Sequence, residues 1–144
     1  MKDEIFYDTN VLYYACDLSE PEKRKVCKAL LTKVFIGETS GVISNQILVE
    51  LYNALTRKLG VKSDTAKVIV DSFITSTNWL KINYNHITVK AALDTSKAFR
   101  APFLDTLITE TMKENGITQI ITENEKDFAR IPGIKIKNPV HYQD

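Results

Sequence analysis

Short apolar runs alternate with longer segments of helical periodicity along the whole chain, and this alternation restricts the possible folds more than any other feature. Strands are predicted at Ile5–Tyr7, Gly41–Ser44, Trp79–Tyr84, Gln119–Thr122 and Ile134–Ile136. Helices are predicted at Glu20–Ile36, Asn45–Leu59, Ser63–Ser76, Ile87–Phe99 and Pro102–Asn115. Strands that alternate with helices of this length are typical of a mainly parallel sheet covered on both faces. The sequence therefore predicts an α/β fold.

The composition is that of one folded domain. The 144 residues are enough to bury a substantial core without disulfides or a structural metal, so we expect a single domain over residues 1–144. Hydrophobic residues make up 44% and charged residues 26%, which excludes a disordered or fibrous chain. The net charge of +1 gives no overall field that would attract nucleic acid, although local basic patches such as Arg57-Lys58 are available as contacts.

The first residues do not resemble a targeting segment. "MKDEIFYDTN" carries acidic residues where a signal peptide would carry its basic region, and no apolar segment follows it. No window of the sequence approaches the length of a membrane span. We therefore expect a cytoplasmic location and no membrane partner.

Polar side chains follow two of the predicted strands at the points where the strands end. Asp8 follows the first strand, and Thr122, Glu123 and Asn124 stand at the end of the fourth. Parallel α/β sheets bind ligands beyond the carboxyl ends of their strands. A purely structural explanation is also available, because Asp-Thr-Asn at residues 8–10 is good turn chemistry and can cap a following helix.

Two further acids lie at the edges of apolar helix faces. At about 100° per residue, Glu50 lies about 40° from Ala54, and Asp105 lies about 20° beyond Met112. Taken alone, Glu50 could form a surface ion pair with a nearby basic residue, and Asp105 is in a first helical turn, where carboxylates are commonly stabilising.

The joint occurrence of these acids favours a metal site over separate structural roles. Carboxylates gathered at one sheet edge repel each other unless a cation neutralises them. Oxygen ligands with no histidine or cysteine beside them select Mg²⁺ or Mn²⁺ over zinc. We therefore expect a magnesium or manganese ion as the cofactor.

Four segments resemble the PIN-domain family, and especially its small VapC-type toxin ribonucleases, in order and spacing. They are "FYDTNVLYYA", "SNQILVELYNAL", "FLDTLITETMKENGITQIITENEKDF" and "IPGIKI". Each motif alone is weak, but four in the right order over essentially the whole chain are a strong signal. The resemblance implies a PIN-like three-layer α/β/α sandwich with a central, mainly parallel sheet of four to five strands.

The resemblance also implies an acidic active site. Asp8 matches the aspartate after the first strand, Glu50 the helix glutamate and Asp105 the aspartate that opens a later helix. Family members have an acid or Asn two residues after the threonine, and often a second acid before a phenylalanine; these places hold Asn124 and Asp127. We select Asp127 as the fourth carboxylate. Asp8 and Asp105 are the expected metal ligands, and the other two acids complete the site directly or through water.

The implied reaction is hydrolysis of RNA phosphodiester bonds by a metal-bound water. Asn10 and Thr122 match supporting positions that orient Asp8 and water, and Asn124 matches a supporting position beside them. The resemblance further implies a small antitoxin protein that occupies a groove near Tyr13 and the stretch from Val26 to Phe35, and a homodimer.

Two other functions are alternatives to the nuclease. A PIN-like module with a degraded site would bind RNA or a protein without cutting it, and the uncharged Asn124 is compatible with that hypothesis. A phosphatase of the haloacid dehalogenase class also begins with an apolar strand and an aspartate, but it needs a second aspartate two residues later as general acid. Residue 10 is Asn, which cannot transfer that proton.

Overall fold

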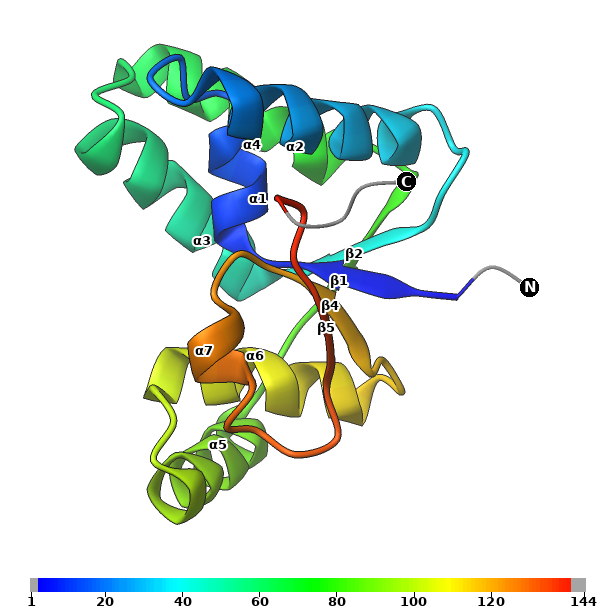
Figure 1. Ribbon diagram of the computed structural model, residues 1–144, viewed down its shortest axis with the longest axis vertical. Helices are drawn as coiled ribbons and strands as arrows, with labels where there is room; N and C mark the ends of the chain where they lie inside the picture. Colours follow the sequence, from blue (N-terminus) through cyan, green and yellow to red (C-terminus); the bar gives the residue numbers. More distant parts are fainter. Residues whose placement is uncertain (1–2, 141–144) are drawn as a thin grey trace.

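A five-stranded parallel sheet forms the centre of the computed structural model, which describes residues 3–140 (Figure 1). The strands are β1 (Ile5–Tyr7), β2 (Gly41–Ser44), β3 (Trp79–Ile82), β4 (Gln119–Ile121) and β5 (Lys135–Lys137). Their spatial order is β3-β2-β1-β4-β5, and every neighbouring pair is parallel. Because β1 lies in the middle, the residue that follows it is placed at the centre of the carboxyl edge of the sheet.

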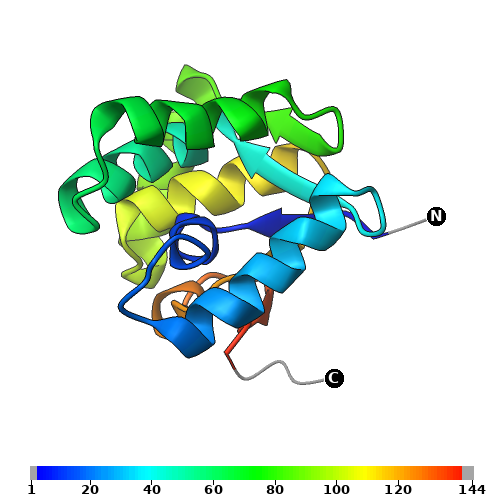
Figure 2. The same cartoon turned by 90° about the horizontal axis from the view of Figure 1, so that it is seen from above.

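Helices cover the sheet on both faces. They are α1 (Thr9–Tyr14), α2 (Pro21–Phe35), α3 (Asn45–Asn53), the π-helical turn η1 (Ala54–Lys58), α4 (Ser63–Thr75), α5 (His86–Phe99), α6 (Phe103–Glu114) and α7 (Glu125–Phe128). Helices α1 to α4 lie on one side of the sheet, and α5 to α7 lie on the other (Figures 1 and 2). This arrangement confirms the predicted three-layer α/β/α sandwich and its parallel sheet.

The predicted elements are present, with differences at their ends. The strand predicted to continue to Tyr84 ends at Ile82, because its only partner is β2, whose last residue, Ser44, pairs with Ile82. The single helix predicted for Asn45–Leu59 changes from α to π geometry at Ala54. The short helix α7 was not predicted, because four residues are too few to show a helical period.

An aromatic cluster closes the core between α2, α4 and the β2–β3 edge of the sheet. The Trp79 ring lies edge-on to Tyr7 and Phe73, with ring centroids 5.1 and 5.2 Å apart, respectively. Gly41 of β2 lies directly against this cluster, where a Cβ atom would stand 2.6 Å from the Val34 side chain and 2.7 Å from the Trp79 ring. Only glycine fits there without a shift of its neighbours.

None of the helices within residues 3–140 is long and apolar enough to cross a membrane.

Candidate active site

Asp8 lies at the carboxyl end of the central strand β1 and is almost fully buried. It is the N-cap of α1, and its Oδ1 accepts a hydrogen bond from the Thr9 backbone N–H at 2.8 Å. Its Oδ2 accepts from the Thr122 hydroxyl at 2.8 Å and from the Asn10 side-chain amide at 3.2 Å. The predicted capping role is thus present, and the same carboxylate is also held by the end of the neighbouring strand.

Thr122 connects the loops after β1 and β4. Its hydroxyl donates to Asp8 and accepts from the Asn10 amide at 3.2 Å and from the Asn124 backbone N–H at 3.0 Å. A hydroxyl has one donor and two acceptor positions, so all three are used. The Asn10 oxygen in turn accepts from the Glu123 backbone N–H at 3.2 Å. Asn10 and Thr122, the two predicted supporting residues, thus both donate hydrogen bonds to the Asp8 carboxylate.

Glu50 projects from α3 toward the same edge of the sheet. Its Oε1 accepts from the Thr9 hydroxyl at 2.7 Å, and its Oε2 accepts from the Gln46 amide at 3.0 Å. The same Gln46 nitrogen donates to the backbone carbonyl of Leu104, just before Asp105, at 3.1 Å. No ion pair joins Glu50 to a basic residue within the described part of the chain. Its contacts thus link α1, α3 and the start of α6.

Asp105 lies in the first turn of α6, and burial and neighbouring charges raise its pKa to about 7. Burial is the largest cause, followed by the negative charges of Asp8, Asp127 and Glu50. The Asn124 side-chain amide donates to the Asp105 carboxylate at 3.3 Å and opposes this rise. The fold thus brings all four predicted acids into one electrostatic cluster.

Burial also raises the pKa of Asp8, to about 6, although three hydrogen bonds to its carboxylate lower it. Two neighbouring carboxyl groups with raised pKa values are typical of a site whose negative charge has no compensating cation. A bound cation would favour the ionised form of both groups.

The fourth predicted acid, Asp127, lies on α7, and its side chain makes no hydrogen bond or ion pair with other residues of the 3–140 range. It is close enough to raise the pKa of Asp105. Asn124 directs its amide nitrogen at Asp105, so its side chain supports that carboxylate. Of the two positions, Asp127 is the one that supplies a free carboxylate to the cluster.

The donors at this edge fit Mg²⁺ or Mn²⁺ because they are all oxygen atoms. No three His, Cys, Asp or Glu side chains of residues 3–140 are close enough together to form a complete ligand set. Magnesium usually keeps several of its waters and is held by one or two carboxylates, so an incomplete set of protein ligands does not exclude it.

A cavity of about 390 Å³ opens beside the acids. It is lined by Asp8, Thr9, Asn10, Tyr13, Glu50, Asn53, Ala54 and Lys58. Thr9 and Gln46, which hold Glu50, were not predicted as site residues, and Lys58 was named only as part of a basic patch that could contact nucleic acid. A hydroxyl or amide next to a predicted acid is a weak signal in sequence, because such residues are common in turns and on helix surfaces.

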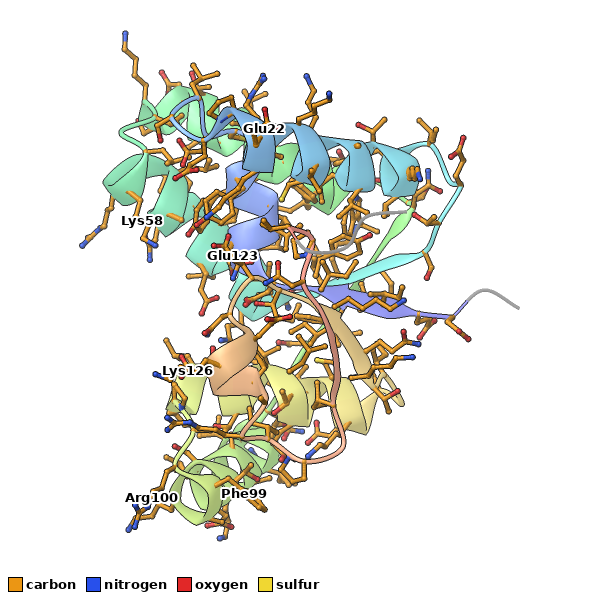
Figure 3. All side chains as sticks on the ribbon, viewed as in Figure 1. Glu22, Lys58, Phe99, Arg100, Glu123 and Lys126 are labelled. Atoms are coloured by element: carbon orange, nitrogen blue, oxygen red, sulfur yellow. The ribbon has the colours of Figure 1, made fainter. Side chains whose placement is uncertain are left out.

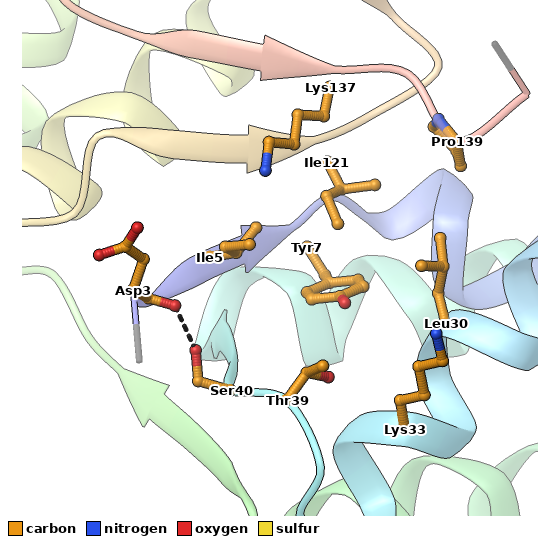
Figure 4. A pocket seen from close by; sticks show the side chains of 10 residues that line it. All are labelled: Asp3, Ile5, Tyr7, Leu30, Lys33, Thr39, Ser40, Ile121, Lys137 and Pro139. Atoms are coloured by element: carbon orange, nitrogen blue, oxygen red, sulfur yellow. Dashed lines mark hydrogen bonds between the residues drawn. The ribbon is translucent and has the colours of Figure 1, made fainter. Parts of the chain in front are cut away.

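A second cavity, of about 380 Å³, lies away from the acids and is mostly apolar (Figure 4). Tyr7, Ile5 and Ile121 contribute to it from the sheet, and Leu30 contributes from α2. The bond drawn in Figure 4 joins the Ser40 hydroxyl to the backbone carbonyl of Asp3 at 2.6 Å. None of the predicted site residues lines this cavity, so it is not the candidate active site.

The profile of the PIN domain matches residues 5–134 of the chain. Among solved structures, VapC20 from Mycobacterium tuberculosis, a sarcin-ricin loop cleaving toxin, is 18% identical, with a TM-score of 0.68 over 87% of this chain and 93% of that one. The DNA-bound VapBC2 from Rickettsia felis is 18% identical, with a TM-score of 0.67 over 94% and 98%. The DNA-bound VapBC from Salmonella typhimurium is 19% identical, with a TM-score of 0.66 over 96% and 99%. No curated protein matches the sequence.

Proposed function

Because this chain belongs to the PIN domain family, we propose that it is a metal-dependent endoribonuclease that hydrolyses phosphodiester bonds of RNA. The observation that supports this most directly is the convergence of Asp8, Glu50 and Asp127 on Asp105, because the negative charges of these three residues act together to raise the pKa of Asp105. Separate structural roles would not require four carboxylates from four different elements to share one edge of the sheet. We further propose that residues 1–144 form a single domain.

Asp8 and Asp105 are proposed to hold Mg²⁺ or Mn²⁺. When bound, the ion polarises the phosphodiester and lowers the pKa of its water. Thr122 and Asn10 keep the Asp8 carboxylate in one orientation through their hydrogen bonds, and Asn124 does the same for Asp105. This fixed geometry limits the reorganisation needed when substrate binds.

Glu50 and Asp127 are proposed to orient the attacking water and accept its proton. The two Glu50 oxygens are tied to Thr9 and Gln46, so this carboxylate is held at a fixed position. Asp127 has no such partner among the described residues and is free to contact water or the ion. Asn10 is bonded to Asp8, Thr122 and the Glu123 N–H, which suits a supporting residue and not the general acid of a phosphatase.

The reaction is tested by incubating purified protein with labelled single-stranded RNAs of varied sequence, with Mg²⁺, with Mn²⁺ and with a chelator. We expect cleavage with either ion and none with the chelator. Asp105→Asn should lower the rate by about 100-fold or more, because it removes a metal-binding charge. Asp94→Asn, on the exposed surface of α5, is the matched control and should cleave normally. Cleavage that survives both the chelator and Asp105→Asn would contradict the proposal.

A binding module remains the alternative, supported by the uncharged Asn124 and by the lack of a complete ligand set within residues 3–140. The same assay separates the two functions. A module without activity would bind RNA while the native protein and Asp105→Asn both failed to cut any substrate.

We also propose that the protein is the toxin of a toxin–antitoxin pair, acts in the cytoplasm as a homodimer and is inhibited by a small antitoxin. The support is the likeness in fold to the VapBC complexes. Expression in a bacterial host should arrest growth, and Asp105→Asn should relieve the arrest. Sedimentation of the purified protein measures its oligomeric state and tests whether it is a dimer. Normal growth during expression of active, soluble enzyme would argue against a toxin.

A further inference from the structure

Lys58 lies at the end of a π-helical turn that directs it toward the acids. The Leu59 N–H donates to the Ala54 carbonyl at 3.1 Å, five residues back, so η1 uses one more residue per turn than an α-helix. In a continuous α-helix, Lys58 would lie about 80° around the axis from Glu50. The wider turn rotates Lys58 back toward the Glu50 face. Such turns are rare and are often found at functional sites.

Tyr13 of α1 holds the Lys58 ammonium at this position. The Lys58 Nζ donates to the Tyr13 hydroxyl at 3.3 Å and lies 5.0 Å from the centroid of the ring. A cation over an aromatic ring is attracted by the negative face of the ring. These two contacts restrict a side chain that is otherwise long and exposed.

Lys58 and Tyr13 both line the cavity that contains Asp8 and Glu50. Lys58 forms no ion pair with a carboxylate of residues 3–140, whereas Lys23 of α2 is bound to Glu123 at 2.7 Å. Figure 3 shows Lys58 above Glu123 and Lys126 below it. A cation that lines the same cavity as Asp8 and Glu50 without pairing with either carboxylate is available for an anion from outside the protein.

We propose that Lys58, held by Tyr13, is a substrate-positioning residue that binds the RNA phosphate next to the one that is cleaved. The proposal rests on the proposed nuclease function and names a contact that orients the substrate in it. The acids repel an RNA backbone, and one fixed cation at the rim of the cavity offsets this repulsion where the chain enters. A lysine near a helix end can also simply stabilise the helix dipole, and the test must separate these two roles.

The test measures binding of a fluorescent single-stranded RNA to metal-free protein over a range of salt concentrations. Each phosphate contact with a single strand contributes about 0.7 to the slope of log K against log salt. We expect Lys58→Ala to make that slope shallower by about 0.7 and to weaken binding about fivefold to tenfold at 0.1 M salt. Lys58→Arg should retain the slope, and Tyr13→Ala should give part of the loss. Lys67→Ala, an exposed lysine on α4, is the control and should leave the slope unchanged.

Cleavage kinetics complete the test. Lys58→Ala should raise KM by a similar factor and leave kcat nearly unchanged, because the contact is made before and during the reaction. If the wild-type protein cleaves RNA and Lys58→Ala has the wild-type salt slope and the wild-type KM, this inference is overturned while the proposed function stands. A fall in kcat with unchanged KM would also overturn it. A wild-type protein that neither binds nor cleaves RNA would overturn both this inference and the proposed function.

Discussion

The Thr122 hydroxyl is the single group on which the orientation of the candidate site depends most. It donates to Asp8 and accepts from the Asn10 amide and the Asn124 N–H, so it joins the loops after β1 and β4. The residue is fully buried, so water cannot replace a lost contact. Removing the hydroxyl would leave two donors and one carboxylate oxygen without this partner.

Thr122→Val is therefore expected to lower the free energy of unfolding by about 1–3 kcal/mol, measured by urea denaturation. Thr111→Val is the matched control, because Thr111 is equally buried but its hydroxyl contacts only the Leu107 carbonyl of its own helix. Thr122→Ser keeps the hydroxyl and should retain most of the free energy of unfolding that Thr122→Val loses. Equal effects of the two valine variants would show that the Thr122 network contributes no more stability than the single hydrogen bond of Thr111.

The pKa of Asp105 predicts how stability depends on pH in the metal-free protein. Its pKa is about 7 in the folded chain, against about 3.9 for an unperturbed aspartate. The contribution of the Asp105 carboxyl group to the stability of the folded chain is therefore fully present below about pH 4 and is lost as the pH rises through 7. Asp105→Asn should make the protein more stable than wild type by about 2–4 kcal/mol at pH 8 and by little at pH 4.

Chemical denaturation in the presence of a chelator at several pH values measures this difference. The exposed Asp94→Asn on α5 is the control and should follow the wild-type curve. A constant difference between Asp105→Asn and wild type from pH 4 to pH 8 would contradict the raised pKa.

At the scale of elements, the packing of β2 against the aromatic cluster positions the start of α3. Ser44 ends β2 and caps α3, with its hydroxyl accepting from the Ile47 N–H at 3.3 Å, and α3 carries Glu50. Gly41→Ala should destabilise the protein by about 1–3 kcal/mol, because the added Cβ would overlap Val34 and Trp79. Thermal denaturation measures the loss, and Val34→Ala in the same chain should reduce it by removing one of the two overlaps. If the losses of stability in Gly41→Ala and Val34→Ala simply added in the double variant, the proposed steric cause would be excluded.

Periodicity located the helices because each buries one apolar face, and parallel topology located Asp8 and Thr122 because strand ends of a parallel sheet meet at one edge. Periodicity did not locate η1, because a π-helical turn is defined by its backbone hydrogen bonds and leaves the pattern of apolar residues unchanged. The sequence therefore indicated Lys58 only as part of a basic patch, whereas in the folded chain it lines the cavity beside Glu50.

At the scale of the whole molecule, four elements bring negative charge to one edge of the sheet, so a cation should stabilise the folded chain. A ligand at 100 times its dissociation constant adds about 2.7 kcal/mol. Mg²⁺ or Mn²⁺ should therefore raise the melting temperature of the wild type and of Asp94→Asn at pH 8, and Asp105→Asn should show a much smaller rise. An equal rise in all three proteins would indicate that the ion binds elsewhere.

The sequence by itself determined the α/β class and the order of the main elements, because these follow from apolar periodicity. It also predicted the four acids, three of them from their places at a strand end or helix edge and Asp127 from the resemblance to the PIN-domain family. The tertiary structure decided the rest. It brought Thr9 and Thr122 against carboxylates from distant segments, turned the Asn124 amide toward Asp105, and left the Asp127 carboxylate without a hydrogen-bond partner among the described residues. These outcomes depend on side-chain direction and burial, which arise only when separate elements pack together and exclude water.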